Sequence, residues 1–195
     1  MMSCAKCLPA ALLLMFFPGT PLFGEDIYFS SVIEDQILLE DNADATRAQA
    51  ARGTNFSYVV VSQIGEEISA GLRGAPGGGD NTILNDGLSG GYDPAIAGDG
   101  QGLFMAVWSN DTVSGDRDIF FAVSIDNGDT WTNAARLDDS DFGLLGEDNR
   151  PSIATDGAGT WVVVWQRTDD AESEAGNDPD IVAVTTTNLG GAWTA

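Results

Sequence analysis

The chain has 195 residues, with 30 aspartates and glutamates, 8 lysines and arginines, no histidine and a formal net charge of −22 at pH 7. Such a surface repels polyanions, so nucleic acids and anionic membranes are poor partners. The lack of histidine removes the commonest general base and metal ligand. Both cysteines, Cys4 and Cys7, lie at the N-terminus, so the remaining chain has no disulfide framework or thiolate metal site.

The first 24 residues have the composition of a secretory signal peptide. Lys6 precedes an apolar run from Leu8 to Phe17, and Pro18 ends that run. The run is too short to cross a bilayer, because a spanning helix needs about 20 residues. We therefore expect residues 1–24 to be removed and the mature chain to be secreted, periplasmic or at the cell surface, without a membrane span.

Internal repeats predict the architecture of the remainder. The stretch from Tyr92 to Trp108 matches Asn149 to Trp165, the stretch from Asp118 to Trp131 matches Asp180 to Trp193, and a weaker copy lies near Arg47 to Ser62. Short apolar runs separated by Gly, Asp and Asn indicate four antiparallel strands in each copy, with Asp-Gly-x-Gly hairpins between the first two. Repeated four-stranded units are typical of β-propeller blades, whereas the alternative, a β-sandwich, gives no reason for such repeats.

We therefore predict an all-β fold, a β-propeller of four-stranded blades with about three blades present. Residues 25–46 are expected to form an N-terminal strand segment whose stretch Ile27 to Leu39 closes the ring. Residues 47–195 are expected to form a partial propeller with blades near 47–86, 94–139 and 151–195. Because closed propellers need at least about four blades, the chain is expected to be the N-terminal part of a longer propeller, with assembly from several chains as the alternative. Residues 25–195 alone are not expected to form a stable monomer.

The stretch from Ser124 to Trp131 has the form Ser-x-Asp-x-Gly-x-Thr-Trp. An aspartate can accept backbone N–H bonds within such a turn, a glycine can adopt positive φ, and a tryptophan can cover the hairpin. We therefore expect a structural role for five residues of this turn, namely Ser124, Asp126, Gly128, Thr130 and Trp131. A degenerate copy, TTNLGGAW, ends at Trp193.

This octet resembles the Asp-box, or bacterial neuraminidase repeat, of sialidase-like β-propellers. The resemblance implies a propeller that is six-bladed when complete, with Asp-boxes on the face away from the functional site. It also implies an anionic substrate held by three arginines, the first in an Arg-x-Pro motif, a tyrosine nucleophile paired with a glutamate, and an aspartate acid/base. The nearest matches are Arg150-Pro151 and, at the paired position, Asp93-Pro94, both without the intervening residue. Asp93 and Arg150 are therefore the candidate binding residues.

Other aromatic residues carry weaker signals. Tyr28, Tyr58 and Tyr92 have no such motif around them. Trp108 and Trp165, at the ends of predicted second strands, are expected in the core or between blades, with a sugar-stacking role as the alternative.

Acidic segments on the predicted site face could hold calcium, the one cofactor that the sequence indicates. One is the connection from Asp138 to Asn149, and the other follows Trp165. Carboxylates are calcium ligands, and the candidate ligands are Asp138, Asp139, Asp141 and Asp148. Because their spacing fits no EF-hand, a solvated acidic loop is the alternative.

The leading functional interpretation is an exported recognition module for an extracellular glycan or protein. The alternative is an exo-α-sialidase-type glycoside hydrolase whose catalytic residues lie mostly beyond Ala195. Because the chain is strongly acidic, a neutral or cationic ligand is expected in preference to an anionic one.

Overall fold

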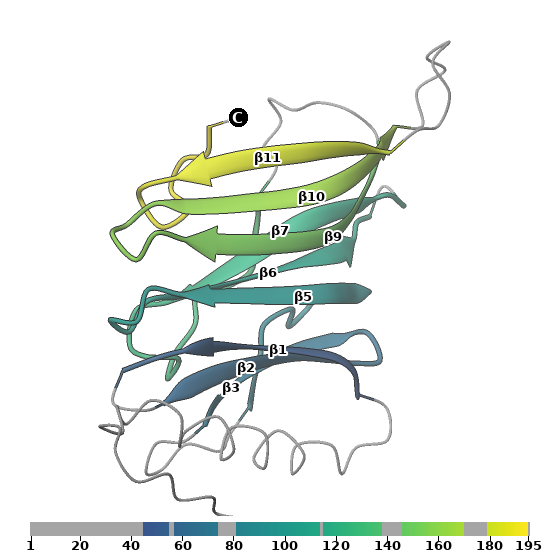
Figure 1. The fold of residues 1–195 in the computed structure, drawn as a ribbon. Coiled ribbons are helices and arrows are strands. Elements are labelled where there is room, and N and C mark those ends of the chain that lie inside the picture. The colour runs from purple at the N-terminus through teal and green to yellow at the C-terminus, as the bar shows by residue number, and fades with distance from the viewer. Residues whose placement is uncertain are drawn as a thin grey trace, which may run out of the picture.

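A computed structural model of the protein describes residues 45–54, 57–73, 81–113, 115–137, 146–169 and 179–194. These residues form strands and connections only, which confirms the all-β prediction (Figure 1). None of the described segments is a helix long and apolar enough to cross a membrane. The predicted signal peptide, the predicted ring-closing strand and the candidate calcium ligands Asp138, Asp139 and Asp141 lie outside the described residues.

The strands form three antiparallel sheets. The first sheet has the order β1 (Ala45–Arg52), β2 (Tyr58–Ile64), β3 (Glu67–Arg73), β4 (Asn81–Ile83). The second has the order β5 (Gly91–Gly98), β6 (Phe104–Asp111), β7 (Arg117–Ser124), β8 (Ala135–Arg136). The third has the order β11 (Asp180–Thr186), β10 (Trp161–Asp169), β9 (Gly146–Thr155), and a single bridge joins Thr185 of β11 to Thr194.

Two strand limits differ from the sequence-based prediction. The repeat predicts a fourth strand from Trp131 to Leu137 in the second unit, but only Ala135 and Arg136 form ladder pairs with β7, while Thr132 and Leu137 add single backbone bonds to Val123 and Ile119. In contrast, β9 begins at Gly146, inside the predicted acidic connection, and Gly146 pairs with Asp169, the last residue of β10. The last four residues of the predicted acidic connection, 146–149, are therefore strand and not loop.

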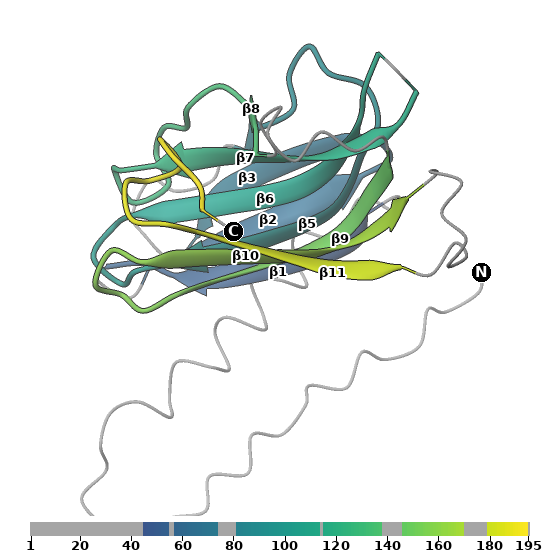
Figure 2. The ribbon, with the colours of Figure 1, turned by 90° about the horizontal axis from the view of Figure 1, so that it is seen from above.

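The sheets are stacked, and the axes of their strands are roughly aligned in both views (Figures 1 and 2). The first strands lie against one another, β1 against β5 and β5 against β9. Each is also the edge strand of its own sheet. The end of the stack where these three strands begin is called the site end below, and the opposite end, with the β1–β2, β5–β6 and β9–β10 hairpins, is called the turn end.

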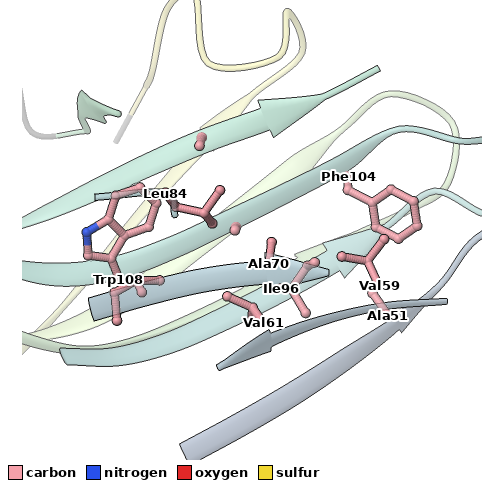
Figure 3. Packing of buried hydrophobic residues seen from close by; sticks show 11 residues of the cluster. Ala51, Val59, Val61, Ala70, Leu84, Ile96, Phe104 and Trp108 are labelled. Carbon is pink, nitrogen blue, oxygen red and sulfur yellow. The ribbon is translucent and has the colours of Figure 1, made fainter. Parts of the chain in front are cut away.

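A separate apolar core fills the space on each side of the second sheet. Phe104 and Trp108 of β6 face the first sheet and pack with Val59 and Val61 of β2, as Figure 3 shows. The alternate β6 residues, together with part of β7, pack on the third sheet in a core that contains Trp161, Val163 and Trp165. Because successive side chains of a strand point to opposite faces, the apolar run of β6 serves both cores. Trp108 and Trp165 are fully buried, which supports the core assignment made from the sequence.

Candidate functional site

At the turn end, the Ser124–Trp131 turn satisfies its own polar groups. The Asp126 carboxylate accepts hydrogen bonds from the Ser124 hydroxyl at 2.8 Å and from the Thr130 N–H at 2.9 Å, while the Ser124 hydroxyl accepts from the Gly128 N–H at 2.9 Å. Burial alone would raise the pKa of Asp126, but the bonds from Thr130 and Ser124 outweigh it, so the pKa is lowered. This arrangement uses the carboxylate to close the turn.

The degenerate copy from Thr186 to Trp193 repeats these three bonds, but Ala192 lacks the hydroxyl with which Thr130 also donates to Asp126. Asn188 accepts from the Thr186 hydroxyl at 2.8 Å and from the Ala192 N–H at 2.9 Å. A side-chain amide oxygen therefore replaces the carboxylate as the acceptor. The Trp193 ring packs edge-on against Phe121 of the second sheet, with centroids 5.5 Å apart, so this turn joins the second and third sheets.

At the site end, β5 and β9 carry matching β-bulges. Tyr92 pairs with Ser109 and Ala95 with Val107, so Asp93 and Pro94 together face Trp108. The same displacement in β9 sets Arg150 and Pro151 against Trp165. Two residues opposite one is the geometry of a bulge, which re-aims the side chains of an edge strand. The prolines fit there because an edge strand does not need every N–H for its ladder.

Asp93 and Arg150 adopt positive φ values of 52° and 55°. Such backbone conformations are costly for residues other than glycine, and they are enriched where a site requires a particular geometry. Positive φ at matching positions of β5 and β9, the first strands of the second and third sheets, therefore marks these two residues as a candidate site.

The bulges line a hollow of about 460 Å³ together with β1. Its walls carry four polar side chains and three small apolar ones, namely Arg47, Gln49, Asp93, Arg150, Ala48, Pro94 and Pro151. Arg47 forms an ion pair with Asp93 across the first two sheets. The Arg150 guanidinium is exposed, and its Nη1 donates to Gln166 Oε1 at 3.4 Å.

The hollow thus brings together both binding residues predicted from the sequence. It adds Arg47, which sequence reasoning missed as a site residue. The sequence alignment sets Arg47 opposite Pro94, but strand register pairs Arg47 with Gln63 and so places it at the rung of Gly91 and Asp148 in the other sheets. The sequence alignment therefore held no correct signal for Arg47 as a site residue.

A second polar cluster links β5, β7 and β9 at the site end. The Arg117 guanidinium lies 4.3 Å from the centroid of the Tyr92 ring, Nε donates to Asp111 at 2.9 Å, and Nη1 donates to Asn149 at 2.9 Å. Burial raises the pKa of the Tyr92 hydroxyl, and the neighbouring Asp111 raises it further. A raised pKa disfavours the phenolate, so Tyr92 has the opposite of the activation that a nucleophile requires.

Asp148, the fourth candidate calcium ligand, lies in β9 and is buried. Its two carboxylate oxygens accept from Arg167 Nε at 2.8 Å and Nη2 at 2.7 Å. A calcium ion at this carboxylate would have to compete with a bidentate guanidinium. Among the residues that the structure describes, no group of three or more acidic side chains is arranged to hold a metal.

Comparison with known proteins gives a likeness of fold. The chain resembles a Hadza microbial sialidase with a TM-score of 0.52 and 19% identity, over 77% of this chain and 36% of that protein. It resembles an α-L-arabinofuranosidase from Fusarium graminearum, solved with an iminosugar inhibitor, with a TM-score of 0.52 and 14% identity, over 79% of this chain and 48% of that protein. No family model and no curated protein sequence matches the chain.

These likenesses support a β-propeller-like fold of the kind found in glycoside hydrolases. The aligned part of this chain spans about a third to a half of each relative. At this level of identity the comparison describes architecture, and function must be argued from the site.

Proposed function

We propose that the protein is a recognition module that binds carbohydrate in the hollow between β1, β5 and β9. The observation that carries this proposal is the convergence of Arg47, Asp93 and Arg150 from three sheets onto one concave surface. Guanidinium, carboxylate and amide groups can each make paired hydrogen bonds to neighbouring hydroxyls. The two proline rings add apolar surface for the C–H face of a sugar, and the named relatives act on glycosidic substrates.

The number of acidic side chains in the hollow favours recognition over hydrolysis. Glycoside hydrolysis ordinarily uses two carboxyl groups on either side of the scissile bond, whereas sialidases use a tyrosine as the nucleophile. Among the described residues that line the hollow, Asp93 is the only acid. Its carboxylate lies beside Arg47, and carboxylate oxygens can accept hydrogen bonds from sugar hydroxyls.

The preferred ligand in this proposal is a neutral glycan. Arg47 is compensated by Asp93, and the chain as a whole carries a net charge of −22. The acidic field disfavours approach of an anionic sugar. We also propose export of the chain, which would place the hollow in contact with extracellular glycans or glycoproteins.

The second candidate function is an exo-α-sialidase-type hydrolase. It is favoured by the presence of two arginines in the hollow, because cationic donors bind a carboxylate well. In this alternative the catalytic residues lie mostly beyond Ala195.

Titration calorimetry with arabinobiose and with N-acetylneuraminic acid tests the two candidates. For the leading proposal we expect arabinobiose to bind, and Asp93→Asn and Arg150→Ala each to weaken binding by about tenfold or more, equivalent to about 1.4 kcal/mol. Arg73→Ala is the matched control, because Arg73 lies on β3 and bonds Asn81 outside the hollow. Binding of N-acetylneuraminic acid alone, lost in Arg150→Ala, would favour the sialidase-type alternative, and binding of neither sugar would contradict the proposal.

Calcium binding at Asp138, Asp139 and Asp141 is a separate proposal. It is supported by the density of hard oxygen ligands in that stretch. Calorimetry with Ca²⁺ should show binding that disappears in an Asp139→Ala/Asp141→Ala double variant. Equal heats for the wild type and this variant would contradict a site at these residues.

A further inference from the structure

We infer that Gln63 is a positioning residue that holds the backbone of Asp93 so that the Asp93 carboxylate faces the hollow. This inference rests on the proposed function of the hollow. The Asp93 N–H donates to Gln63 Oε1 at 3.2 Å. The amide of Gln63 is itself oriented, because its Nε2 donates to the Gly65 carbonyl at 2.8 Å, and the side chain is buried.

Asp93 needs such support because of its conformation. Its φ of 52° lies in the left-handed region, which is unfavourable for a residue with a Cβ. The bulge also takes Asp93 out of the regular β5–β6 pairing. Without the Gln63 oxygen, this partly buried N–H would lose its partner, and leaving a buried donor unsatisfied is unfavourable.

The first sheet contacts Asp93 twice. Gln63 and Arg47 are direct cross-strand partners in the β1–β2 ladder. Gln63 binds the backbone of Asp93, and Arg47 binds its carboxylate. The cross-strand pair Arg47–Gln63 therefore holds both the bulged backbone of Asp93 and the Asp93 carboxylate.

The corresponding residue of the second sheet does not act on the next bulge. Asn110 occupies the place of Gln63 in the repeat, and its amide donates to the carbonyls of Ser89 and Asp111. Arg150 is instead held by its own sheet, through the 3.4 Å bond to Gln166. The two bulge residues are therefore supported differently, Asp93 by the neighbouring sheet and Arg150 by its own sheet.

Amide hydrogen exchange measured by NMR tests the role of Gln63. In Gln63→Met, which keeps the side-chain length and removes the acceptor, we expect the Asp93 N–H to exchange about tenfold faster or more. Gln63→Glu keeps an acceptor oxygen but loses the Nε2 bond to the Gly65 carbonyl, so it should restore slow exchange only in part. Asn85→Leu is the control, because Asn85 is buried and its bonds to Ile68 and Glu66 do not involve Asp93.

Affinity for arabinobiose provides the second measurement. We expect Gln63→Met to weaken binding by about tenfold and Asn85→Leu to leave it unchanged at a temperature where both variants are folded. Unchanged Asp93 exchange in Gln63→Met, or equal acceleration in Asn85→Leu, would overturn the positioning role. If the wild type binds no sugar while Asp93 exchange responds to Gln63→Met, the proposed function fails and the backbone contact stands.

Discussion

The turns at Ser124–Trp131 and Thr186–Trp193 share three internal bonds but have different attachments. In the first, Asn127 Oδ1 accepts from the Thr54 N–H at 3.0 Å and its Nδ2 donates to the Ser57 hydroxyl at 2.9 Å, which ties the second sheet to the first. In the second, Leu189 stands at that place and packs on the apolar core between the second and third sheets. The closure of the turn is thus independent of the chemistry that joins it to its neighbour.

A second difference between these sheets lies at the site end. In the second sheet, Gly91 pairs with Asn110 across β5 and β6. At the matching rung of the third sheet, Asp148 pairs with Arg167, and both side chains are buried. One repeat position therefore holds a neutral pair in one unit and a buried ion pair in the next.

Removing the cation of this buried pair should have the largest effect. Arg167→Met leaves the Asp148 carboxylate buried without its bidentate partner, so we expect a loss of about 3–5 kcal/mol in the free energy of unfolding, measured by urea denaturation. Arg117→Met is the comparison variant: its ion pair with Asp111 is partly exposed and contributes only about 0–1 kcal/mol, so the loss should be smaller even though the contacts to Tyr92 and Asn149 are also removed. Equal losses for the two variants would contradict this account.

Removal of the Trp131 indole should have the next largest effect. Trp131 is partly buried and packs on the core between the first two sheets. We therefore expect Trp131→Ala to cost about 2–3 kcal/mol, less than the 3–5 kcal/mol typical of a fully buried tryptophan. Trp161→Ala, at a fully buried indole, supplies the upper reference in the same denaturation experiment. A cost below about 0.5 kcal/mol, the range of surface substitutions, would show that Trp131 does not support the turn.

Removal of the Asn127 amide tests the different attachments directly. Asn127 and Leu189 have φ values of 65° and 56°, so glycine can replace either without backbone strain. We expect Asn127→Gly to lose about 1–2 kcal/mol, because the Thr54 N–H and the Ser57 hydroxyl lose their partner. Amide exchange should quicken at Thr54 in this variant and not in Leu189→Gly. Faster Thr54 exchange in both variants would contradict a local contact.

The smallest expected effect concerns pH. The pKa of Asp126 is lowered in the folded protein, so its contribution to stability is present above the unfolded pKa and is lost as pH falls through the folded pKa. Asn188, its counterpart, does not titrate. On acidification below about pH 4, the free energy of unfolding should fall less in Asp126→Asn than in the wild type. The difference between the two losses should be under about 1 kcal/mol, because Asp126 is exposed. Parallel pH profiles of the urea midpoint would contradict this linkage.

Local features of the fold were the most predictable from the sequence. The Asp-Gly-x-Gly hairpins, for example, are closed by Asp99, which accepts from the Leu103 N–H at 3.0 Å, and by Asp156, which accepts from the Thr160 N–H at 2.9 Å. These bonds span four residues, so the residue types alone indicate them. The apolar strands β6 and β10 were recognisable for the same reason, through the pattern of neighbouring residues.

Contacts between sheets were less predictable. Arg47, Gln63 and Asp93 meet because two sheets pack at a particular angle, and no spacing within the sequence encodes that angle. The pairing of Asp148 with Arg167 depends on strand register. The acidic residues around Asp148 led to the prediction of a loop there, so the register could not be inferred. The two bulge residues of the candidate site, Asp93 and Arg150, could therefore be predicted from the sequence. The first-sheet residues that hold Asp93, Arg47 and Gln63, could not.

The absence of a side chain at Gly128 has a consequence for the shape of the stack. A Cβ there would lie 2.4 Å from Val59 Cγ2 of the first sheet, and a Cβ at the matching Gly190 would lie 2.4 Å from Phe121 of the second. A methyl group at either position would act as a wedge and push two sheets apart at the turn end. Because the rotation from one repeat to the next sets the curvature of an array, these two glycines help to determine how tightly the sheets fan out around the hollow at the opposite end.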